Sequence, residues 1–342
     1  MVERKRILIT GASGFIGGFL VDEALRRGYE VWAGIRAGSS RKYLQDERIG
    51  IICLNYDSKD ALVEQLRAFA DSAGVWDYVI HNAGITKALE KKDFYKVNTF
   101  NTQILIEALA AAGCKPRKFL LMSSLSSYGP VNEDSFRPIR TDDDRKPNTA
   151  YGKSKLEAEL FLEAQPHFPY IILLPTGVYG PEDRDYLMEI KSIKSGFDLK
   201  AGMKPQKITF IYVKDLVVAA FMAIENENVK NKSYFVADGD VYTDADFVRI
   251  VKKLLNKRFV ISLRIPLWMC YIACFFSEIF GHLTGKAMTL NTDKYYILKQ
   301  RNWTCDAEPI RRELGFTPVY DLRKGLDETI RYSKEKGLLR DK

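Results

Sequence analysis

Histidine and cysteine are scarce in this sequence, and their spacing excludes several kinds of site. The 342 residues include three histidines and five cysteines. The histidines lie far apart, at positions 81, 167 and 282, and no two cysteines have the CxxC spacing of a thiolate zinc site. An odd number of cysteines also argues against a complete disulfide framework. We therefore predict no metal site and expect a reducing compartment, the cytoplasm.

Concentrated positive charge and an N-terminal apolar segment are also missing. The net charge is +8, but Lys and Arg are spread along the chain, without the basic blocks and interleaved aromatic residues of a nucleic-acid-binding protein. Residues 1–6 lead directly into an apolar strand pattern, so we expect no signal peptide. With 46% hydrophobic and 28% charged residues, the chain is expected to form one large or two closely associated globular units.

The most apolar stretch is too short to span a bilayer. Ile265–Phe276 has 12 residues, against the ~20 that a transmembrane helix needs. We expect a buried helix that covers a substrate cleft; an interfacial helix that dips into a membrane and a surface for a partner protein are the alternatives. Cys270 and Cys274, one helical turn apart, are interpreted as small core residues.

A glycine-rich turn near the N-terminus organises the rest of the chain. An apolar strand pattern from Ile7 is followed by Gly11, Gly14 and Gly17, and a helical pattern runs from Phe15 to Arg27. Glycines let backbone and phosphate approach closely, and the first N–H groups of a helix carry partial positive charge. This order of strand, turn and helix predicts a pyrophosphate site, with Phe15 and Ile16 at the helix start beside the bound group.

Strand and helix patterns then alternate along the first half of the chain. Apolar strands are predicted at Glu30–Ile35 and Ile49–Leu54, and a long helix at Phe94–Ala112. Alternation of this kind is typical of a parallel sheet covered on both faces, so we predict an α/β fold. A doubly wound sheet binds its ligands at the carboxyl ends of the strands.

Polar residues at the ends of two predicted strands are candidates for binding the adenosine part of a dinucleotide. Arg36 follows the second strand, where a cation suits a 2′-phosphate and a carboxylate suits a free ribose hydroxyl. The sequence therefore predicts NADP, with NAD as the alternative and Arg41 as a weaker second phosphate ligand. Asn55 and Asp57 follow the third strand, and either could contact the adenine.

Three residues of the middle segment have the chemistry of carbonyl reduction. Tyr151 and Lys155 stand at i and i+4 of a predicted helix, so both side chains leave the same face. Tyr151 could donate the proton, Lys155 would lower the pKa of the phenol, and Ser124 would donate a hydrogen bond to the carbonyl oxygen. Each residue type is common on protein surfaces, so the prediction depends on the three together.

Together these motifs resemble the extended short-chain dehydrogenase/reductase family, in the superfamily of NAD-dependent epimerases and dehydratases, over nearly the whole chain. Supporting motifs are Asn82–Gly84, Val97–Asn98, Tyr128–Gly129 and Pro175–Pro181. The resemblance implies a Rossmann-type doubly wound parallel sheet at 1–180. It also implies a smaller, mainly substrate-binding region at 181–342, with segments near 208–237 returning to the sheet. It makes Ser124, Tyr151 and Lys155 catalytic, and it adds further cofactor-binding residues: Ala83, Gly84, Asn98, Pro175 and Val178.

Two departures from the family pattern concern the substrate. Members that act on sugar nucleotides carry Arg-x-x-Asn before the Tyr-Gly-Pro motif and an Arg-Asp pair before the Phe-Ile-Tyr-Val motif. This chain has Leu173–Thr176 at the first place and Ile208–Thr209 at the second, although Lys204 or Lys207 could compensate. Since a diphosphate is best bound by a bidentate cation, these departures disfavour a nucleotide sugar.

The apolar segment Ile265–Phe276 and the ending Ala307–Pro318 resemble those of the 3β-hydroxysteroid dehydrogenase and dihydroflavonol reductase branches. We therefore predict an NADP(H)-dependent oxidoreductase that interconverts a secondary alcohol and a ketone, or reduces an aldehyde, on a fairly apolar substrate. The alternatives are a nucleotide-sugar epimerase or dehydratase and a catalytically silent NADP-binding protein. The resemblance also implies a homodimer that packs the long helices following Phe94 and Tyr151, with alanines at 108 and 110–112 permitting close approach.

Overall fold

The computed structural model describes residues 4–165 and 167–339, which form two compact units. The first unit comprises the described residues up to Ser127, then Ala150–Leu174 and Val217–Tyr234. The second comprises Tyr128–Thr149, Pro175–Leu216 and the described residues from Phe235 onward. Residues 128–149, which the sequence assigns to the dinucleotide-binding domain, thus belong by their contacts to the second unit.

A seven-stranded sheet with the strand order β11-β6-β5-β4-β1-β2-β3 forms the centre of the first unit. Its strands in chain order are β1 (Arg6–Thr10), β2 (Glu30–Ile35), β3 (Ile49–Cys53), β4 (Tyr78–His81), β5 (Lys118–Met122), β6 (Tyr170–Pro175) and β11 (Lys232–Val236). The pairings from β6 across to β3 are all parallel. Ile7, Leu8 and Ile9 of β1 are fully buried, as expected for a strand covered on both faces. The doubly wound fold is confirmed.

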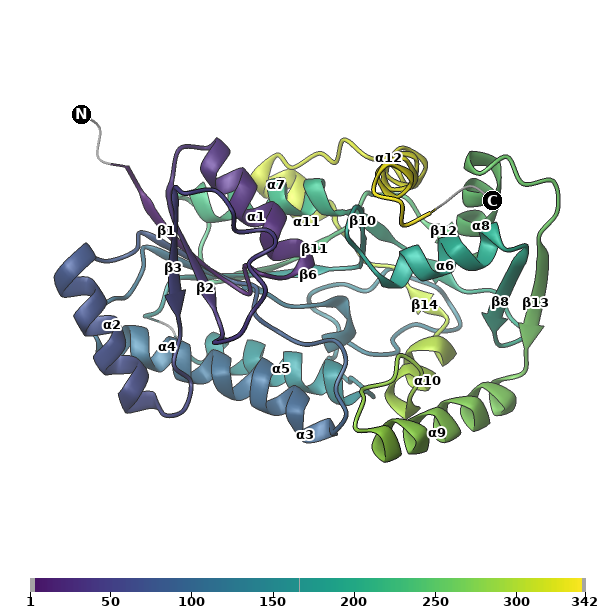
Figure 1. The fold of residues 1–342 in the computed structure, drawn as a ribbon, viewed down its shortest axis with the longest axis horizontal. Helices are drawn as coiled ribbons and strands as arrows, with labels where there is room; N and C mark the ends of the chain where they lie inside the picture. Colours follow the sequence, from purple (N-terminus) through teal and green to yellow (C-terminus); the bar gives the residue numbers. More distant parts are fainter. Residues whose placement is uncertain (1–3, 166, 340–342) are drawn as a thin grey trace. The chain divides into compact units, whose positions relative to one another are not determined.

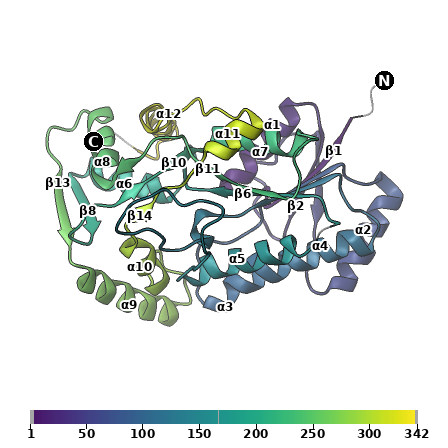
Figure 2. The same cartoon turned by 180° about the vertical axis from the view of Figure 1, so that it is seen from behind.

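Helices cover both faces of this sheet (Figures 1 and 2). Both views show α2, α4 and α5 on one face and α1 and α7 on the other. The bounds are α1 (Phe15–Arg26), α2 (Lys59–Ala73), α4 (Asn101–Ala111), α5 (Ala150–Glu163) and α7 (Val213–Glu225). A short 3₁₀ turn, η2 (Leu125–Ser127), follows β5.

The long helix predicted at Phe94–Ala112 is helical but irregular. It begins with α3 (Lys91–Phe94), continues as a π-helical segment, η1 (Tyr95–Phe100), and becomes α-helical again in α4. The sequence pattern does not reveal the π-helical segment. Such segments occur mostly at functional sites, and this one contains Asn98.

The second unit contains short strands and six more helices among the residues described. The helices are α6 (Asp185–Lys194), α8 (Asp244–Leu254), α9 (Leu267–Thr284), α10 (Thr292–Lys299), α11 (Glu308–Leu314) and α12 (Leu322–Glu335). The strands are β7 (Gly177–Tyr179), β8 (Phe197–Ala201), β9 (Lys207–Ile208), β10 (Phe210–Tyr212), β12 (Tyr242–Thr243), β13 (Ile261–Ile265) and β14 (Asn302–Trp303).

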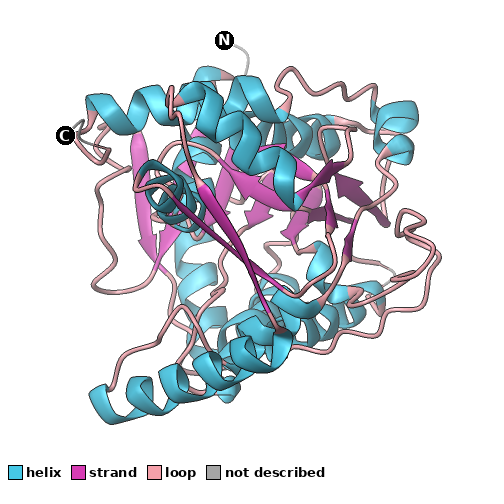
Figure 3. Ribbon diagram, turned by 90° about the vertical axis from the view of Figure 1, so that its right-hand side faces the viewer, coloured by secondary structure: helices cyan, strands magenta, loops and turns pink. Residues whose placement is uncertain are grey.

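Residues 208–212, at the start of the segments expected to return to the large sheet, are divided between two small sheets. β9 lies between β12 and β14, whereas β10 pairs with β7, so of the segments near 208–237 β11 is the one that joins the large sheet. β10, α6, α8 and α12 meet in a core that contains Tyr179, Phe210, Phe247 and Leu326. β8 and β13 form a separate two-stranded parallel ribbon, which faces the viewer in Figure 3.

The expectation of a buried helix at Ile265–Phe276 is wrong. The helix there, α9, has 18 residues, a mean hydropathy of 1.3 and only 11% of its residues buried. Within the part of the chain that the structure describes, it is the one helix long and apolar enough to cross a membrane by length and composition. A hydrophobic composition predicts that a helix is covered, but it does not distinguish the protein's own core from a membrane or a partner protein.

Candidate active site

The glycine loop at the end of β1 packs so closely on the start of α1 that a side chain is excluded at its glycines. A Cβ on Gly17 would lie 2.1 Å from the Gly11 carbonyl oxygen, and Gly11 itself has φ +67°. Gly14 is the N-cap of α1 and makes no side-chain cap, so the first N–H groups of the helix, at Phe15 and Ile16, are open to an anion. These five residues therefore form a backbone cradle of the kind that binds a pyrophosphate.

A hydrogen-bonded chain under this loop joins β1, β4 and η1. The Ala83 N–H donates to Thr10 Oγ1, which lies 2.8 Å from His81 Nδ1. His81 Nε2 lies 2.9 Å from Thr102 Oγ1, and that hydroxyl donates to the Asn98 carbonyl. Because the Thr102 proton is committed to Asn98, we assign the ring proton of His81 to Nε2.

The sequence did not predict a role for His81, because no neighbouring residues in the sequence distinguish a histidine of a functional site from one of the core. Burial, with a smaller contribution from the charge of Lys155, lowers the pKa of His81 to about 3. The ring is therefore neutral and holds one fixed tautomer. It fixes the backbone of Ala83, which contacts Gly11 closely, and so it connects the loops after β1 and β4.

Asn98 and Lys155 flank the backbone of Gly84. The side-chain oxygen of Asn98 accepts the Ile85 N–H at 2.8 Å, and its amide donates to Ser154 Oγ at 3.0 Å. A Cβ on Gly84 would come within 3.1 Å of Asn98 Oδ1 and 3.2 Å of Lys155 Nζ. The structure thus brings these predicted cofactor residues together beyond the end of β4.

Ser124 and Tyr151 meet beyond the end of β5. The Ser124 hydroxyl is hydrogen-bonded to the Tyr151 phenol, and the Tyr151 ring packs edge-to-face on Phe94 with centroids 6.1 Å apart. Burial raises the pKa of Tyr151, the Glu159 charge raises it further, and the Ser124 hydrogen bond opposes the change. In this structure the group that lowers the pKa of Tyr151 is the Ser124 hydroxyl. Lowering of this pKa by Lys155, beside a bound cofactor, remains a prediction.

Lys155 is itself strongly affected by its surroundings. It is buried, its Nζ donates to the Met122 carbonyl at 2.9 Å, and burial lowers its pKa to about 8. The charge of Glu159 opposes this shift. A lysine in this environment changes charge easily near neutral pH, which suits a site that handles protons.

Glu159 is a further member of the site that the sequence alone did not reveal. It is almost fully buried, accepts a hydrogen bond from the Ser123 hydroxyl, and continues the helical row that starts with Tyr151 and Lys155. The spacing i, i+4, i+8 was available in the sequence, but a glutamate in a helix is ordinarily a surface residue. Its burial makes it the counter-charge of the Lys155 ammonium.

The predicted adenosine-binding residues lie at the carboxyl ends of β2 and β3. Arg36 is exposed directly after β2. Asn55 and Asp57 are exposed after β3, and the side-chain oxygen of Asn55 accepts the Asp57 N–H at 2.9 Å. Since β1, β2 and β3 are parallel neighbours, these residues share one edge of the sheet with the glycine loop.

Pro175 and Val178 belong by their contacts to the second unit. Pro175 ends β6, and Val178 lies in β7 opposite Ile211 of β10. Their proposed packing on a nicotinamide remains a prediction.

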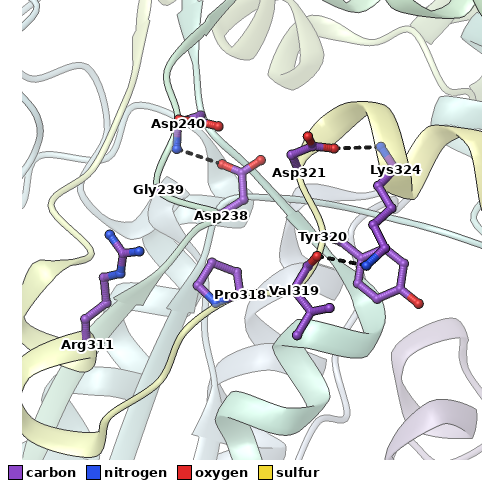
Figure 4. Close-up of a pocket in the computed structure, with 9 residues that line it drawn as sticks. All are labelled: Asp238, Gly239, Asp240, Arg311, Pro318, Val319, Tyr320, Asp321 and Lys324. Atoms are coloured by element: carbon purple, nitrogen blue, oxygen red, sulfur yellow. Dashed lines mark hydrogen bonds between the residues drawn. The ribbon is translucent and has the colours of Figure 1, made fainter.

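The second unit also contains a cavity of ≈ 360 Å³ that holds none of the predicted site residues (Figure 4). It is lined by groups of both charges: Asp238, Gly239, Asp240, Arg311, Pro318, Val319, Tyr320, Asp321 and Lys324. Asp238 accepts the Asp240 N–H at 3.1 Å and the Tyr242 hydroxyl at 2.9 Å. Burial, and to a lesser degree the neighbouring charges of Asp240 and Asp321, nevertheless raise the pKa of Asp238 to about 7.

Asp238→Asn is expected to stabilise the protein at alkaline but not at acidic pH. Between its usual pKa of 3.8 and about 7, the folded state keeps a proton that the unfolded chain releases. Stability therefore falls as the pH rises through this window, by up to about 4 kcal/mol, and the amide avoids this loss. Urea unfolding at pH 5 and pH 8 measures the difference. Asp240→Asn, in the same loop but exposed, is the control, and a gain from Asp238→Asn that is equal at both pH values contradicts the argument.

The fold and the site define a class of protein. A parallel doubly wound sheet, a backbone cradle at the first strand-to-helix turn, and Ser124, Tyr151 and Lys155 at the end of β5 are the features of a nicotinamide-dependent enzyme of the extended short-chain dehydrogenase/reductase type. The chain belongs to the NAD dependent epimerase/dehydratase family, whose sequence pattern matches residues 7–237.

Individual relatives within this family differ in substrate. The chain is 26% identical to a UDP-glucose 4-epimerase of Vibrio cholerae over 95% of its own length and 94% of that protein's. It is 24% identical to a decarboxylating sterol-4-alpha-carboxylate 3-dehydrogenase of Dictyostelium discoideum, over 95% and 99% of the two chains. The solved structure of a Thermotoga maritima UDP-glucose 4-epimerase with UDP-glucose has a TM-score of 0.75 and 20% identity, and covers 97% of this chain and 99% of that one.

Proposed function

We propose that the protein is an NADP(H)-dependent oxidoreductase that interconverts a secondary alcohol and a ketone, or reduces an aldehyde, on a fairly apolar substrate. The observation that carries the proposal is the meeting of Ser124 and Tyr151 beyond β5, with Lys155 against Gly84 one helical turn away. This arrangement places a proton donor and a hydrogen-bond donor together at the end of a strand.

In this proposal each residue of the site has a defined role. The bound cofactor supplies or accepts the hydride. Tyr151 gives its phenolic proton to the carbonyl oxygen during reduction, and Ser124 holds that oxygen by a hydrogen bond. Lys155 binds a ribose hydroxyl and provides positive charge, while Glu159 keeps the ammonium protonated.

An epimerase or dehydratase acting on a nucleotide sugar is the second candidate, because the epimerase of Vibrio cholerae is among the similar proteins. The residues at the two departures favour the first candidate. Leu173 and Leu174 are buried in β6, and the Thr209 hydroxyl is used internally, donating to the Trp303 carbonyl at 2.9 Å. Neither place itself carries a cation for a diphosphate, and Lys204 and Lys207 are the cations that could compensate.

A homodimer is also part of the proposal. Phe100 of η1 and Leu160 of α5 are 53% and 47% exposed, on the two helices that the family packs together. Ala110 and Ala111 are exposed beyond them on α4, whereas Ala108 is buried inside the unit. Two exposed apolar side chains on these helices support self-association there.

Thermal stabilisation by ligands tests the cofactor and the substrate together. Ligands that bind only the folded state raise the melting temperature. We expect NADP to raise it more than NAD does, and a steroid ketone to raise it further in the presence of NADP. Arg36→Ser should remove the preference for NADP, because a 2′-phosphate then loses its cation. Arg48→Ser, which removes an exposed arginine that is paired with Asp46, should leave the preference in place.

Two outcomes would contradict this proposal. Equal stabilisation of the wild-type protein by NADP and NAD would exclude Arg36 as a phosphate ligand. Stabilisation by a UDP-sugar, and not by the steroid ketone, would make the nucleotide-sugar enzyme the better assignment.

A further inference from the structure

The side chains of α9 are distributed in the opposite way to those of an ordinary surface helix. The side of α9 that packs on the second unit carries small residues: Cys274 and Gly281 are buried, and Cys270 and Ser277 are half-buried. The large apolar residues of α9 face outward. The most exposed are Trp268 at 65%, Phe276 at 64% and Leu283 at 80%, and six more on this helix are over 40% exposed, namely Met269, Tyr271, Ile272, Phe275, Ile279 and Phe280. A contiguous apolar face of this kind marks an interaction site.

The outward face of α9 carries no carboxylate. Glu278 is the one acidic residue of the helix, and its side chain accepts the Thr292 N–H at 2.8 Å, which directs it toward the start of α10. α10 packs on α9 at the margin of this face, where the partly exposed Tyr271 contacts Tyr295 edge-to-face with centroids 5.2 Å apart. Nothing acidic on α9 therefore opposes contact with a negatively charged surface.

The ribbon of β8 and β13, which leads into α9, has an exposed apolar side of its own. Phe197 pairs with Ile261 and Leu199 pairs with Leu263, so the four side chains lie on one side of the ribbon, and all are more than half exposed. β13 leads through Pro266 directly into α9, as Figure 1 shows along the lower right edge of the view. We call these four residues and the outward residues of α9 the α9 surface.

Exposed basic residues lie beside each part of the α9 surface. Lys204 follows β8, Arg258 precedes β13 and Lys286 follows α9, and all three are exposed. Asp198, the acidic residue of β8, contacts Lys200 at 3.3 Å, and Asp244 contacts Arg264 of β13 at 2.8 Å, so both carboxylates are already paired. The rim of the α9 surface is therefore positive, which complements anionic lipid headgroups.

The segments that flank α9 limit the orientation in which the helix can contact a membrane. Its N-terminal end continues from β13, which pairs with β8, and its C-terminal end turns back at Gly285 into α10. Both flanking segments belong to the same unit, so the helix cannot cross a bilayer without carrying one of them through it. An apolar helix with aromatic residues and a basic rim lies in the interface plane instead.

We propose that the α9 surface docks on an anionic phospholipid bilayer, with α9 parallel to the membrane plane and its large apolar side chains inserted at the boundary between headgroups and acyl chains. This goes beyond the oxidoreductase proposal and does not depend on it, since no cofactor or catalytic residue takes part. Trp and Tyr at such a depth have their rings in apolar surroundings and their polar atoms near the headgroups.

Flotation of the full chain with vesicles tests the docking. We expect binding to vesicles of phosphatidylcholine with phosphatidylglycerol, and about tenfold weaker binding to phosphatidylcholine alone. The triple variant Trp268→Ser, Phe276→Ser, Leu283→Ser should lose at least about tenfold in affinity. The control variant Val75→Ser, Val319→Ser removes apolar residues that are 46% and 65% exposed elsewhere, and should bind like the wild type. Arg258→Glu with Lys286→Glu should remove the preference for anionic vesicles.

Quenching by brominated phosphatidylcholine tests the depth of insertion. The chain has four tryptophans, of which Trp268 lies on the α9 surface, Trp76 is 1% exposed, and Trp32 and Trp303 are partly buried. Brominated acyl chains should quench the wild-type fluorescence and have little effect on Trp268→Phe, which keeps an apolar ring and should still bind. Failure to bind anionic vesicles, or quenching that survives Trp268→Phe, overturns the proposal. The proposal is also overturned if the triple variant loses self-association but keeps its vesicle binding, because the α9 surface then binds a second copy of this chain.

Discussion

Tyr151→Phe is expected to lower turnover by about 10³-fold while leaving cofactor affinity and melting temperature nearly unchanged. The substitution removes the phenolic proton donor and keeps the ring that packs on Phe94. Ser124 stays in place, because its Oγ also accepts the Ser126 N–H at 3.2 Å. Steady-state turnover, with the ligand that stabilises the protein as substrate, and cofactor titration measure the two halves of the prediction.

Tyr56→Phe is the matched control for this experiment. The Tyr56 hydroxyl is buried and has no hydrogen-bond partner within the described part of the chain. Removing it should not reduce turnover or stability, since a buried hydroxyl without a partner contributes nothing favourable to folding. If Tyr151→Phe retains more than about a tenth of the wild-type turnover, a general-acid contribution of the expected size is excluded and Tyr151 is not the proton donor.

Gly17→Ala is expected to weaken cofactor binding by about 100-fold or more, because it forces apart the loop and the helix start that would hold the pyrophosphate. The added Cβ would lie 2.1 Å from the Gly11 oxygen and 2.7 Å from the Ala12 Cα, and both are backbone atoms. The loop or the start of α1 must move. We expect a loss of about 1–3 kcal/mol in unfolding free energy from this overpacking. Fluorescence titration with the cofactor, below the melting temperature, measures the binding.

Gly28→Ala separates the loss of binding from the loss of stability. Gly28 follows the other end of α1 and has φ +82°, and a Cβ added there would meet no atom within 4 Å. Its substitution costs about 1–2 kcal/mol through the left-handed backbone alone, and cofactor affinity should not change. Equal weakening of binding by the two variants would mean that Gly17 acts only through overall stability.

Sequence reasoning predicted the first unit well because its signals are local. Buried parallel strands are continuous apolar runs, as in Ile7–Ile9, and the helix starting at Phe15 begins directly after the glycine turn. Tyr151 and Lys155 could be paired from their spacing in one helix. Their roles as donor and charge remain predictions that the variants above test.

The features that the sequence did not predict depend on contacts between distant segments. The ribbon joins Phe197–Ala201 to Ile261–Ile265, and nothing in either stretch specifies the other as its partner. His81 is linked to Thr10 and Thr102 across three elements, and the burial of Glu159 becomes evident only when α5 packs against the sheet. For α9, composition predicted burial, whereas the arrangement of small and large side chains around the helix places the large ones outside.

The first unit is built from three separate segments of the chain, and this limits where the chain can be truncated. Its sheet is completed by β11, whose strand Lys232–Val236 lies beyond β6 at the end of the strand order. A chain ending near residue 180 would lack all of α7 and all of β11, leaving β6 as an unprotected edge that invites aggregation. During synthesis, more than two-thirds of the 342 residues must therefore leave the ribosome before the first unit can complete its sheet.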